Sequence, residues 1–396
     1  MVNREEKKIM GLTILSHSLV HLYEGVLPPL IPILMEKFTT DYFHLGIVVT
    51  DFSYAFGLGS LPAGFLSDRV GPRGLITFYL FGAGLLSVFI LPVGSLVTYA
   101  VLMGFIGLFC SIYHPASNTL ISHAIGEKGR AFGIHGIAGS LGVAIVPALS
   151  AFIGSAMGWK APHIMFGVLG ISAGLFSLTV PRWSVTKSTV GLKKESETAL
   201  KKISYLNLIV FFTSAAALGL TYKGIMTFLP AYMGQKVHLS FFKLDTVAIG
   251  GTIATFALLS GAAGQYLAGR LLDRYKPERL YLGAIVFGTM FVFLMSKGVN
   301  IILVASAILY AFFYFSTQPI QNYLLSKYLP KHRQGLGFGI HFFLTFGVGS
   351  TAAAVCGYLA DHFGLESIFY AMGLCFLVSC CLALLLVTRV KENPAP

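Results

Sequence analysis

Long apolar stretches follow one another along almost the whole chain, and only short polar segments separate them. Twelve of these stretches are at least about 18–20 residues long, the length with which a helix crosses a bilayer. They cover residues 9–35, 44–67, 73–93, 95–122, 131–157, 161–181, 204–231, 246–269, 278–296, 299–325, 335–359 and 366–388. Lipid offers no hydrogen-bond partner to the backbone, so each stretch must bond its own N–H and C=O groups as a helix. The pattern predicts an all-α membrane protein with twelve transmembrane helices.

One longer polar segment, residues 182–203, divides the twelve apolar stretches into two sets of six. We therefore expect an N-terminal six-helix bundle over residues 1–181, a cytoplasmic linker over 182–203 and a C-terminal six-helix bundle over 204–396. Twelve helices of about 20 residues use most of the chain. No additional soluble domain is expected.

The composition supports a membrane protein. Apolar residues make up 55% of the 396 residues, charged residues only 11%, and the mean hydropathy is +0.77. Soluble domains carry about 25% charged residues. The formal net charge of +12 would suggest a nucleic-acid partner in a soluble protein. Here the basic residues lie in short gaps between apolar stretches, which excludes a soluble enzyme and a nucleic-acid binder.

The basic residues also predict the orientation in the membrane. If the N-terminus lies inside, the segments on that side contain 22 of the 28 Lys and Arg residues, and those on the other side contain five. Lys223 falls within an apolar stretch. Cytoplasmic loops of membrane proteins carry such an excess of Lys and Arg. Both termini are therefore predicted to be cytoplasmic, in a multi-pass protein of the cell membrane.

The two halves of the chain resemble each other in sequence. Four pairs of segments match in the same order, at offsets between 199 and 206 residues. The pairs are YEGVLP (23–28) with YKGIMT (222–227), AGFLSDRVGPRGL (63–75) with AGRLLDRYKPERL (268–280), HPASNTLIS (114–122) with QPIQNYLLS (318–326), and GRAFGIHG (129–136) with GLGFGIHF (335–342). Parallel repeats of this kind place a substrate site between the halves, near the middle of the bilayer.

The segment GFLSDRVGPRG after the second stretch resembles the signature loop of the major facilitator superfamily, which has the pattern G-x-x-x-D-R-x-G-R-[RK]. A second copy of this loop after the eighth stretch is also expected of that superfamily. Within it, SHSLVHLYEGVLPPLIP (16–32) and YHPASN (113–118) are similar to segments of the fosmidomycin-resistance-like transporters. The resemblance covers essentially the whole chain. It implies the major facilitator fold, with two pseudo-symmetric six-helix bundles.

The same resemblance implies a gating role for the charged residues of the repeated loop. In the superfamily this loop clamps one half against the other in the outward-facing state. The residues are Asp68, Arg69 and Arg73 in the first half and Asp273 and Arg274 in the second. Contacts between such carboxylates and arginines across the cytoplasmic face could form and break as the halves rock.

Ionisable residues within the apolar stretches are functional candidates, because a charge inside a membrane is costly. His17, His21 and Glu24 are spaced four and three residues apart, so they share one face of a helix. The repeat matches Glu24 with Lys223 in the seventh stretch. The acid and the base could pair across a central cavity in one state and separate in another. Protonation of Glu24 would then free Lys223 for an anionic solute, and a static ion pair that holds the halves together is the alternative.

Further polar residues within the apolar stretches are candidates for lining the same cavity or relaying protons. They are Asp51 and Tyr54 in the second stretch, Tyr113, His114 and Asn118 in the fourth, His135 in the fifth, Tyr222 in the seventh, Gln318 and Asn322 in the tenth and His341 in the eleventh. Asn118 matches Asn322 in the repeat, and His135 matches His341. Hydrogen bonds between helices would explain the amides, packing would explain the two matched histidines, and Asp51 could simply face water.

The spacing of His17 and His21 also suits two ligands of one metal ion. A complete cation site would need more carboxylates, however, and the ammonium group of Lys223 would repel the ion. No metal site and no cofactor are therefore predicted.

The sequence predicts a proton-coupled secondary active transporter that moves a small organic solute by alternating access. Lys223, the histidines and the tyrosines favour an anionic or zwitterionic solute. A proton-driven drug exporter of the fosmidomycin-resistance type is the alternative, and a metal-ion transporter is a further one. No HExxH or GxxxxGK[ST] motif occurs, and neither an enzyme nor an ATP-driven pump is predicted. The expected partners are the solute, protons and the lipid bilayer, and we expect the chain to function as a monomer.

Overall fold

A computed structural model of the chain describes residues 4–125, 128–181, 205–238, 245–272, 274–329 and 334–392. These residues form helices, and no strand occurs among them, as the apolar pattern predicts. The first half contains α1 (Arg4–Gly25), η1 (Pro28–Leu30), α2 (Ile31–Phe38), α3 (Tyr42–Val70), α4 (Pro72–Val88), α5 (Leu96–Cys110), α6 (Tyr113–Ala124), α7 (Lys128–Met157) and α8 (Lys160–Ser177). The second half contains α9 (Tyr205–Lys236), α10 (Thr246–Leu272), α11 (Pro277–Lys297), α12 (Asn300–Tyr328), α13 (Gln334–Phe342), η3 (Phe343–Gly347), η4 (Val348–Ser350), α14 (Thr351–Phe363) and α15 (Glu366–Glu392).

All twelve predicted apolar stretches are helical. Within the described residues, ten helical segments are long and apolar enough to cross a membrane by length and composition. The other two predicted stretches correspond to α4 and α8. Helix α4 is apolar but has only 17 residues, and α8 begins with Lys160 and has His163 at the end of its first turn. Both helices still pack within the bundle, where α4 contacts α8.

Three of the predicted stretches contain a break. Pro28 and Pro29 have no N–H to donate to the carbonyl groups one turn earlier, so α1 ends at Gly25 and η1 separates it from α2. Pro115 has the same effect on the carbonyl of Ser111, where α5 gives way to α6. The eleventh stretch changes from α13 through the π-helical turn η3 and the 3₁₀ turn η4 into α14. Such π turns are frequent at functional sites.

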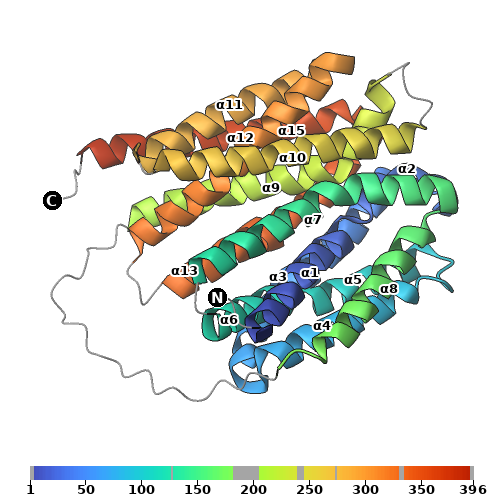
Figure 1. Cartoon of the computed structure of the whole chain (residues 1–396). Coiled ribbons are helices and arrows are strands. Elements are labelled where there is room, and N and C mark those ends of the chain that lie inside the picture. Colours follow the sequence, from blue (N-terminus) through green and yellow to red (C-terminus); the bar gives the residue numbers. More distant parts are fainter. Residues whose placement is uncertain are drawn as a thin grey trace, which may run out of the picture.

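The helices form two bundles that lie side by side, α1–α8 in one and α9–α15 in the other (Figure 1). In the first bundle α1 packs on α7, α3 on α5 and α4 on α8, and in the second α10 packs on α12 while α9 and α11 pack on α15. The main contacts between the bundles join α7 to α10 and α3 to α14. This is the arrangement that the sequence repeat predicts.

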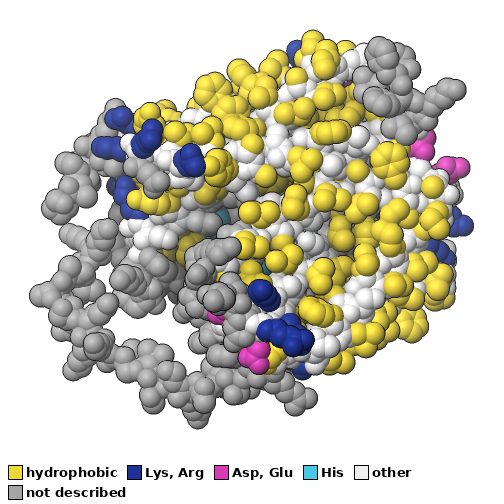
Figure 2. Space-filling model, viewed as in Figure 1, with side chains coloured by type: hydrophobic (Ala, Val, Ile, Leu, Met, Phe, Trp, Pro, Cys, Tyr) yellow, Lys and Arg dark blue, Asp and Glu magenta, His cyan; other side chains and the backbone are white. Residues whose placement is uncertain are grey.

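The outer surface of the bundles is apolar. Figure 2 shows hydrophobic side chains spread over the face of the helices, with most of the visible charged side chains near the helix ends. Val97, Met157 and Ile301 have exposed fractions of 74%, 76% and 73%. Water-soluble monomers rarely expose so much contiguous apolar surface, whereas lipid tails accept it. The chain is a multi-pass membrane protein.

The contact between α3 and α14 includes a helix cap supplied by the other bundle. The backbone N–H groups of Tyr42 and Phe43, at the start of α3, donate to the carboxylate of Asp361 on α14, at N···O distances of 3.0 and 2.8 Å. The first N–H groups of a helix lack partners within the helix, and a carboxylate there also interacts favourably with the helix dipole. Farther along α3, Thr50 Oγ1 donates to the carbonyl oxygen of Ser350 at 2.9 Å.

Glycines let the two bundles approach closely. A Cβ atom added to Gly46 of α3 would lie 2.3 Å from the carbonyl oxygen of Ala353, and one added to Gly251 of α10 would lie 2.4 Å from that of Pro147. Neither position could carry a side chain unless the other bundle moved. We call these contacts of α3 with α14 and of α7 with α10, around Gly46 and Gly251, the bundle seam.

Several predicted features lie outside the described residues. These are the linker 182–203 and Asp273. Asp68 and Arg69 belong to the last turn of α3, but their side chains are also outside the description. The boundaries at residues 181 and 204 therefore stay a prediction, as does the gating role of the repeated loop.

Candidate functional site

A cavity of about 620 Å³ lies between the two bundles. Small-molecule sites in proteins commonly enclose about 300–1,000 Å³. Eight of the sequence-predicted site residues line it: His17, His21, Glu24, His114, Asn118, Tyr222, Gln318 and Asn322. They come from α1 and α6 in the first bundle and from α9 and α12 in the second. Residues from both halves of the repeat therefore face one common space.

Glu24 links the two bundles. Its Oε1 accepts a hydrogen bond from Nζ of Lys223 at 2.5 Å, and its Oε2 accepts one from Nδ1 of His21 at 3.0 Å. The Glu24 and Lys223 side chains are only 14% and 7% exposed. Removing one member of a buried ion pair leaves an uncompensated charge, which is strongly unfavourable. The pair therefore connects the halves most strongly when both groups carry their charge.

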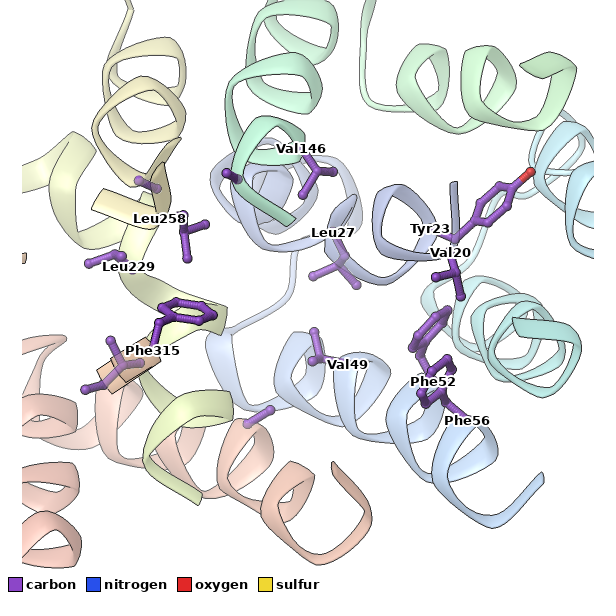
Figure 3. Packing of buried hydrophobic residues seen from close by; sticks show 14 of the residues in the cluster. Val20, Tyr23, Leu27, Val49, Phe52, Phe56, Val146, Leu229, Leu258 and Phe315 are labelled. Atoms are coloured by element: carbon purple, nitrogen blue, oxygen red, sulfur yellow. The ribbon is translucent and has the colours of Figure 1, made fainter. Parts of the chain in front are cut away.

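A second, smaller space of about 60 Å³ lies on the other side of this ion pair. His21, Glu24 and Tyr222 line both spaces, whereas Lys223 lines only the smaller one. The rest of its wall is largely apolar and includes Val49, Val146, Leu229 and Leu258, which come from four helices of the two bundles (Figure 3). The ion pair thus separates the large cavity from an apolar pocket under the bundle seam.

His17, His135 and Tyr113 form a connected group at the wall of the cavity. The Nδ1–H of His17 donates to the carbonyl oxygen of His135 at 2.7 Å, and the two imidazole rings stack with their centroids 4.1 Å apart. The hydroxyl of Tyr113 donates to the carbonyl oxygen of Thr13 at 2.6 Å. It therefore accepts from the Nε2–H of His135, 2.8 Å away. These bonds assign one tautomer to each ring and hold His17 in a single orientation.

The glycines of α7 make room for α1. A Cβ atom on Gly139 would lie 2.5 Å from Nε2 of His17, and one on Gly142 would lie 2.9 Å from the Cα and carbonyl oxygen of Ser18. Small residues allow such close approach between membrane helices. Gly139 and Gly142 therefore allow α1 to approach α7 closely, with His17 on the cavity wall.

Sequence reasoning missed a polar residue at the opposite wall. Gln265 of α10 lines the cavity and donates from Nε2 to Oε1 of Gln318 at 2.7 Å, while its own Oε1 accepts from Oγ of Ser140 at 3.4 Å. The chain of bonds joins α7, α10 and α12. The signal in the sequence is that Gln265 is a polar residue within the eighth apolar stretch, but the stretch alone does not say whether it faces the cavity.

An aromatic wall was missed for a different reason. The rings of Tyr222 and Tyr314 stack with centroids 5.3 Å apart and planes 13° from parallel, and Phe315, Phe342 and Phe346 line the cavity around them. Aromatic residues are scattered throughout membrane helices, so the sequence does not distinguish those that face a cavity from those that face lipid.

Other predicted site residues do not line either space. Tyr54 lines neither space, and its hydroxyl forms a hydrogen bond with Oγ1 of Thr351 at 2.7 Å across the bundles. Asp51, one turn away on α3, is half-buried outside both linings. His341 packs on Phe211 with ring centroids 5.8 Å apart, and its buried Nδ1 has no hydrogen-bond partner among the described residues. Tyr113 and His135 do not line the cavity themselves, but they hold His17, which does.

The described gating candidates lie apart from the cavity. Nε of Arg73 donates to the carbonyl oxygen of Ser177 at 2.9 Å, which is a contact within the first bundle. Arg274 follows the end of α10 and is exposed. In this conformation the contact of Arg73 with Ser177 joins α4 to α8 and does not cross to the other bundle.

A sequence model of one protein family matches most of the chain. The model described as Major Facilitator Superfamily matches residues 13–354 and 246–396. The chain belongs to the major facilitator superfamily. It is similar to an uncharacterized MFS-type transporter of Methanocaldococcus jannaschii, with 24% identity over 87% of this chain and 89% of the relative. It is also 24% identical to the fosmidomycin resistance protein of Escherichia coli (91% of this chain, 88% of the relative) and 23% identical to a D-galactonate transporter of that species (91% and 90%).

Solved structures agree on the fold. A mutant of the nucleoside transporter NupG superposes with a TM-score of 0.80 at 16% identity, over 96% of this chain and 99% of that one. A D-xylose–proton symporter superposes with a TM-score of 0.76 at 15% identity, over 98% of each chain. The predicted major facilitator fold is confirmed. The chain is a secondary transporter of this superfamily and not an enzyme.

Proposed function

We propose that this transporter couples the movement of a small organic anion or zwitterion to that of protons, and that Glu24 is the proton-binding group. The observation that supports the proposal is the ion pair between Glu24 and Lys223, which joins the two bundles where the cavity ends. A buried carboxylate and ammonium group balance each other's charge. Protonation of Glu24 removes that balance and leaves the charge of Lys223 available for an anionic group of the solute.

The geometry supports a coupling cycle in which the pair breaks. Burial disfavours the charged form of a carboxyl group, and a nearby cation favours it. Both effects depend on the position of one bundle relative to the other, because Lys223 belongs to one bundle and Glu24 to the other. A proton bound on one side of the membrane can then be released on the other. Lys223 does not line the large cavity in this conformation. The solute would therefore reach Lys223 only after the ion pair with Glu24 has broken.

The predicted orientation assigns this conformation to one half of the cycle. The large cavity extends to Leu61, Asn118 and Asn322, which lie near the ends of α3, α6 and α12 that lead to the predicted cytoplasmic loops. The bundle seam lies beyond Glu24, toward the opposite side. With both termini in the cytoplasm of a cell-membrane protein, the conformation is inward-facing. We propose that the monomer carries out the whole cycle, since the cavity lies within one chain.

Two features support an organic anion as the solute. The cavity offers the amides of Gln265, Gln318 and Asn322 as hydrogen-bonding groups, in a volume suited to a small molecule. The relative from Escherichia coli named as a D-galactonate transporter handles a sugar acid by that name. Export of drug-like compounds is the second candidate, which the similarity to the fosmidomycin resistance protein and the aromatic wall around Tyr222 favour.

The test is solute flux in proteoliposomes under an imposed pH gradient. We expect a panel of sugar acids, sulfonates and phosphonates, fosmidomycin included, to contain a compound whose flux follows the gradient and stops when a protonophore dissipates it. A pH-sensitive dye should report proton movement only when that compound is present. Solute flux that is the same with and without the gradient, and without proton movement, would contradict proton coupling.

A further prediction concerns the bundle seam. Asp361→Ala removes the two hydrogen bonds that hold the start of α3 against α14. Losing about 1–2 kcal/mol from one conformation changes its population by about 5–30-fold. A cysteine at Val49, in a background without the five native cysteines, should therefore react faster with a membrane-impermeant reagent added outside. The matched control is Asp41→Ala, because the Asp41 carboxylate caps His44 of the same helix within one bundle. Equal labelling in the two variants would show that Asp361 does not hold the seam closed.

A further inference from the structure

Three histidines of the first bundle meet at the cavity wall. His17 and His21 lie on α1 and His114 on α6, and all three line the large cavity. One ring nitrogen of each lies within 4.8 Å of the others. The sequence pattern shows only His17 and His21 at suitable spacing, because His114 lies far along the chain. The tertiary structure therefore supplies a third imidazole that the spacing argument lacked.

The hydrogen bonds of these rings leave nitrogen lone pairs free. His17 donates from Nδ1 to the carbonyl oxygen of His135, and His21 donates from Nδ1 to the carboxylate of Glu24. In a neutral imidazole the other nitrogen, Nε2, then carries an unprotonated lone pair. Metal-binding histidines in proteins typically show this arrangement, with one ring nitrogen on the metal and the other donating to a backbone carbonyl or a carboxylate.

The surroundings hold the first of these rings rigidly. His17 stacks on His135, and His135 is itself held by Tyr113. Gly139 lies close to the Cε1–Nε2 edge of the His17 ring, where a Cβ atom would clash. His114 contacts His17 and His21 with ring centroids 5.1 and 5.8 Å away, and no hydrogen bond to its ring is described. Zn–N bonds of about 2.0–2.1 Å require nitrogen separations of about 3.4 Å, so the three rings, whose ligand atoms lie within 4.8 Å of one another, must move closer when the ion binds.

The local charge does not oppose a cation. From the sequence, the ammonium group of Lys223 is expected to act as a charge that would repel a metal ion. In the structure its charge is balanced by Glu24 at 2.5 Å. The carboxylate of Glu24 also lies against His21, where it would stabilise an imidazole that carries part of the charge of a bound ion.

The cluster is not a by-product of the repeat. At the offsets of 199 and 204 residues, the positions that match His17, His21 and His114 in the second half are Ala216, Leu220 and Gln318. The fold therefore does not require histidine at these positions. Their convergence is a property of the first bundle alone.

We propose that His17, His21 and His114 bind one divalent transition-metal ion of the Zn²⁺ class. Imidazole nitrogens suit Zn²⁺, Cu²⁺, Ni²⁺ and Co²⁺ better than Mg²⁺ or Ca²⁺. Three histidines leave at least one coordination position, which faces the cavity and would take water or a carboxylate oxygen. This inference does not depend on proton coupling, because binding is measured without transport.

The experiment uses the full chain in lipid nanodiscs, purified with a tag that contains no histidine. Zn²⁺ is titrated against a chromophoric chelator, and Co²⁺ is added separately so that its visible absorption reports the coordination geometry. We expect one Zn²⁺ per chain and an intense Co²⁺ spectrum typical of four-coordinate nitrogen sites. His114→Gln should weaken Zn²⁺ binding by at least about 100-fold, since loss even of a supporting partner costs about 10–100-fold.

Two control variants locate the site. His362→Gln removes an exposed histidine on α14, and His163→Gln removes a buried one on α8 that bonds Tyr99. Both should bind Zn²⁺ as the unchanged protein does. Thermal unfolding without metal identifies any variant that fails to fold, and His21→Gln then provides a second test of the cluster. Zn²⁺ binding that survives both His114→Gln and His21→Gln, or that disappears with His362→Gln, would overturn the proposal.

Discussion

Glu24→Gln is expected to abolish proton-driven accumulation of solute and to leave exchange of solute down its own gradient intact. The amide keeps the shape of the side chain and can still accept a hydrogen bond from Lys223 Nζ, now 2.5 Å from Oε1 of Glu24. It cannot bind or release a proton. If the two bundles still rock, solute crosses, but no proton crosses with it. Accumulation against a gradient should therefore fall to the level of protein-free liposomes, while counterflow of labelled solute continues.

The matched control is Asp51→Asn. Asp51 is also an acid within an apolar helix, but it lines neither the cavity nor the smaller pocket. It should keep accumulation and its pH dependence. If Glu24→Gln still accumulates solute with an unchanged pH dependence, the proton-binding group lies elsewhere, and His21 and Asp51 become the candidates to be replaced next.

Lys223→Met is expected to destabilise the folded protein by about 3 kcal/mol, because it leaves the carboxylate of Glu24 buried without its partner. The value lies at the lower end of what broken buried pairs cost, since the neighbouring cavity gives Glu24 some access to water. Combining Lys223→Met with Glu24→Gln removes both charges, and most of the lost stability should return. Unfolding in mixed micelles with increasing denaturing detergent measures the difference.

A surface pair provides the comparison for this second prediction. Lys236 pairs with Glu366, and the side chains are 34% and 36% exposed. Lys236→Met should cost less than about 1 kcal/mol, because exposed ion pairs contribute little. If Lys223→Met costs no more than Lys236→Met, or if the double variant is no more stable than Lys223→Met alone, the ion pair between the bundles does not stabilise this conformation.

The apolar pattern by itself determined the helices and their order. Spans of this kind must be helical because lipid leaves the backbone no other partner, so hydropathy and length suffice to find them. The repeat also determined that Glu24 and Lys223 occupy equivalent places in the two halves. Equivalent first helices face each other across a pseudo-symmetric interface, which is why an alignment of the sequence with itself matched an acid and a base that the structure joins.

The rotation of each helix about its axis was decided by tertiary packing. In a chain whose helices are apolar on all sides, hydropathy does not say which face meets lipid and which meets a cavity. Tyr54 therefore lies between the bundles, whereas Gln265 lines the cavity. The contact of His114 with His17 and His21 depends on the packing of α6 against α1. Gly139 of α7 lies close to the edge of the His17 ring. Such contacts join residues about a hundred positions apart, and no local pattern encodes them.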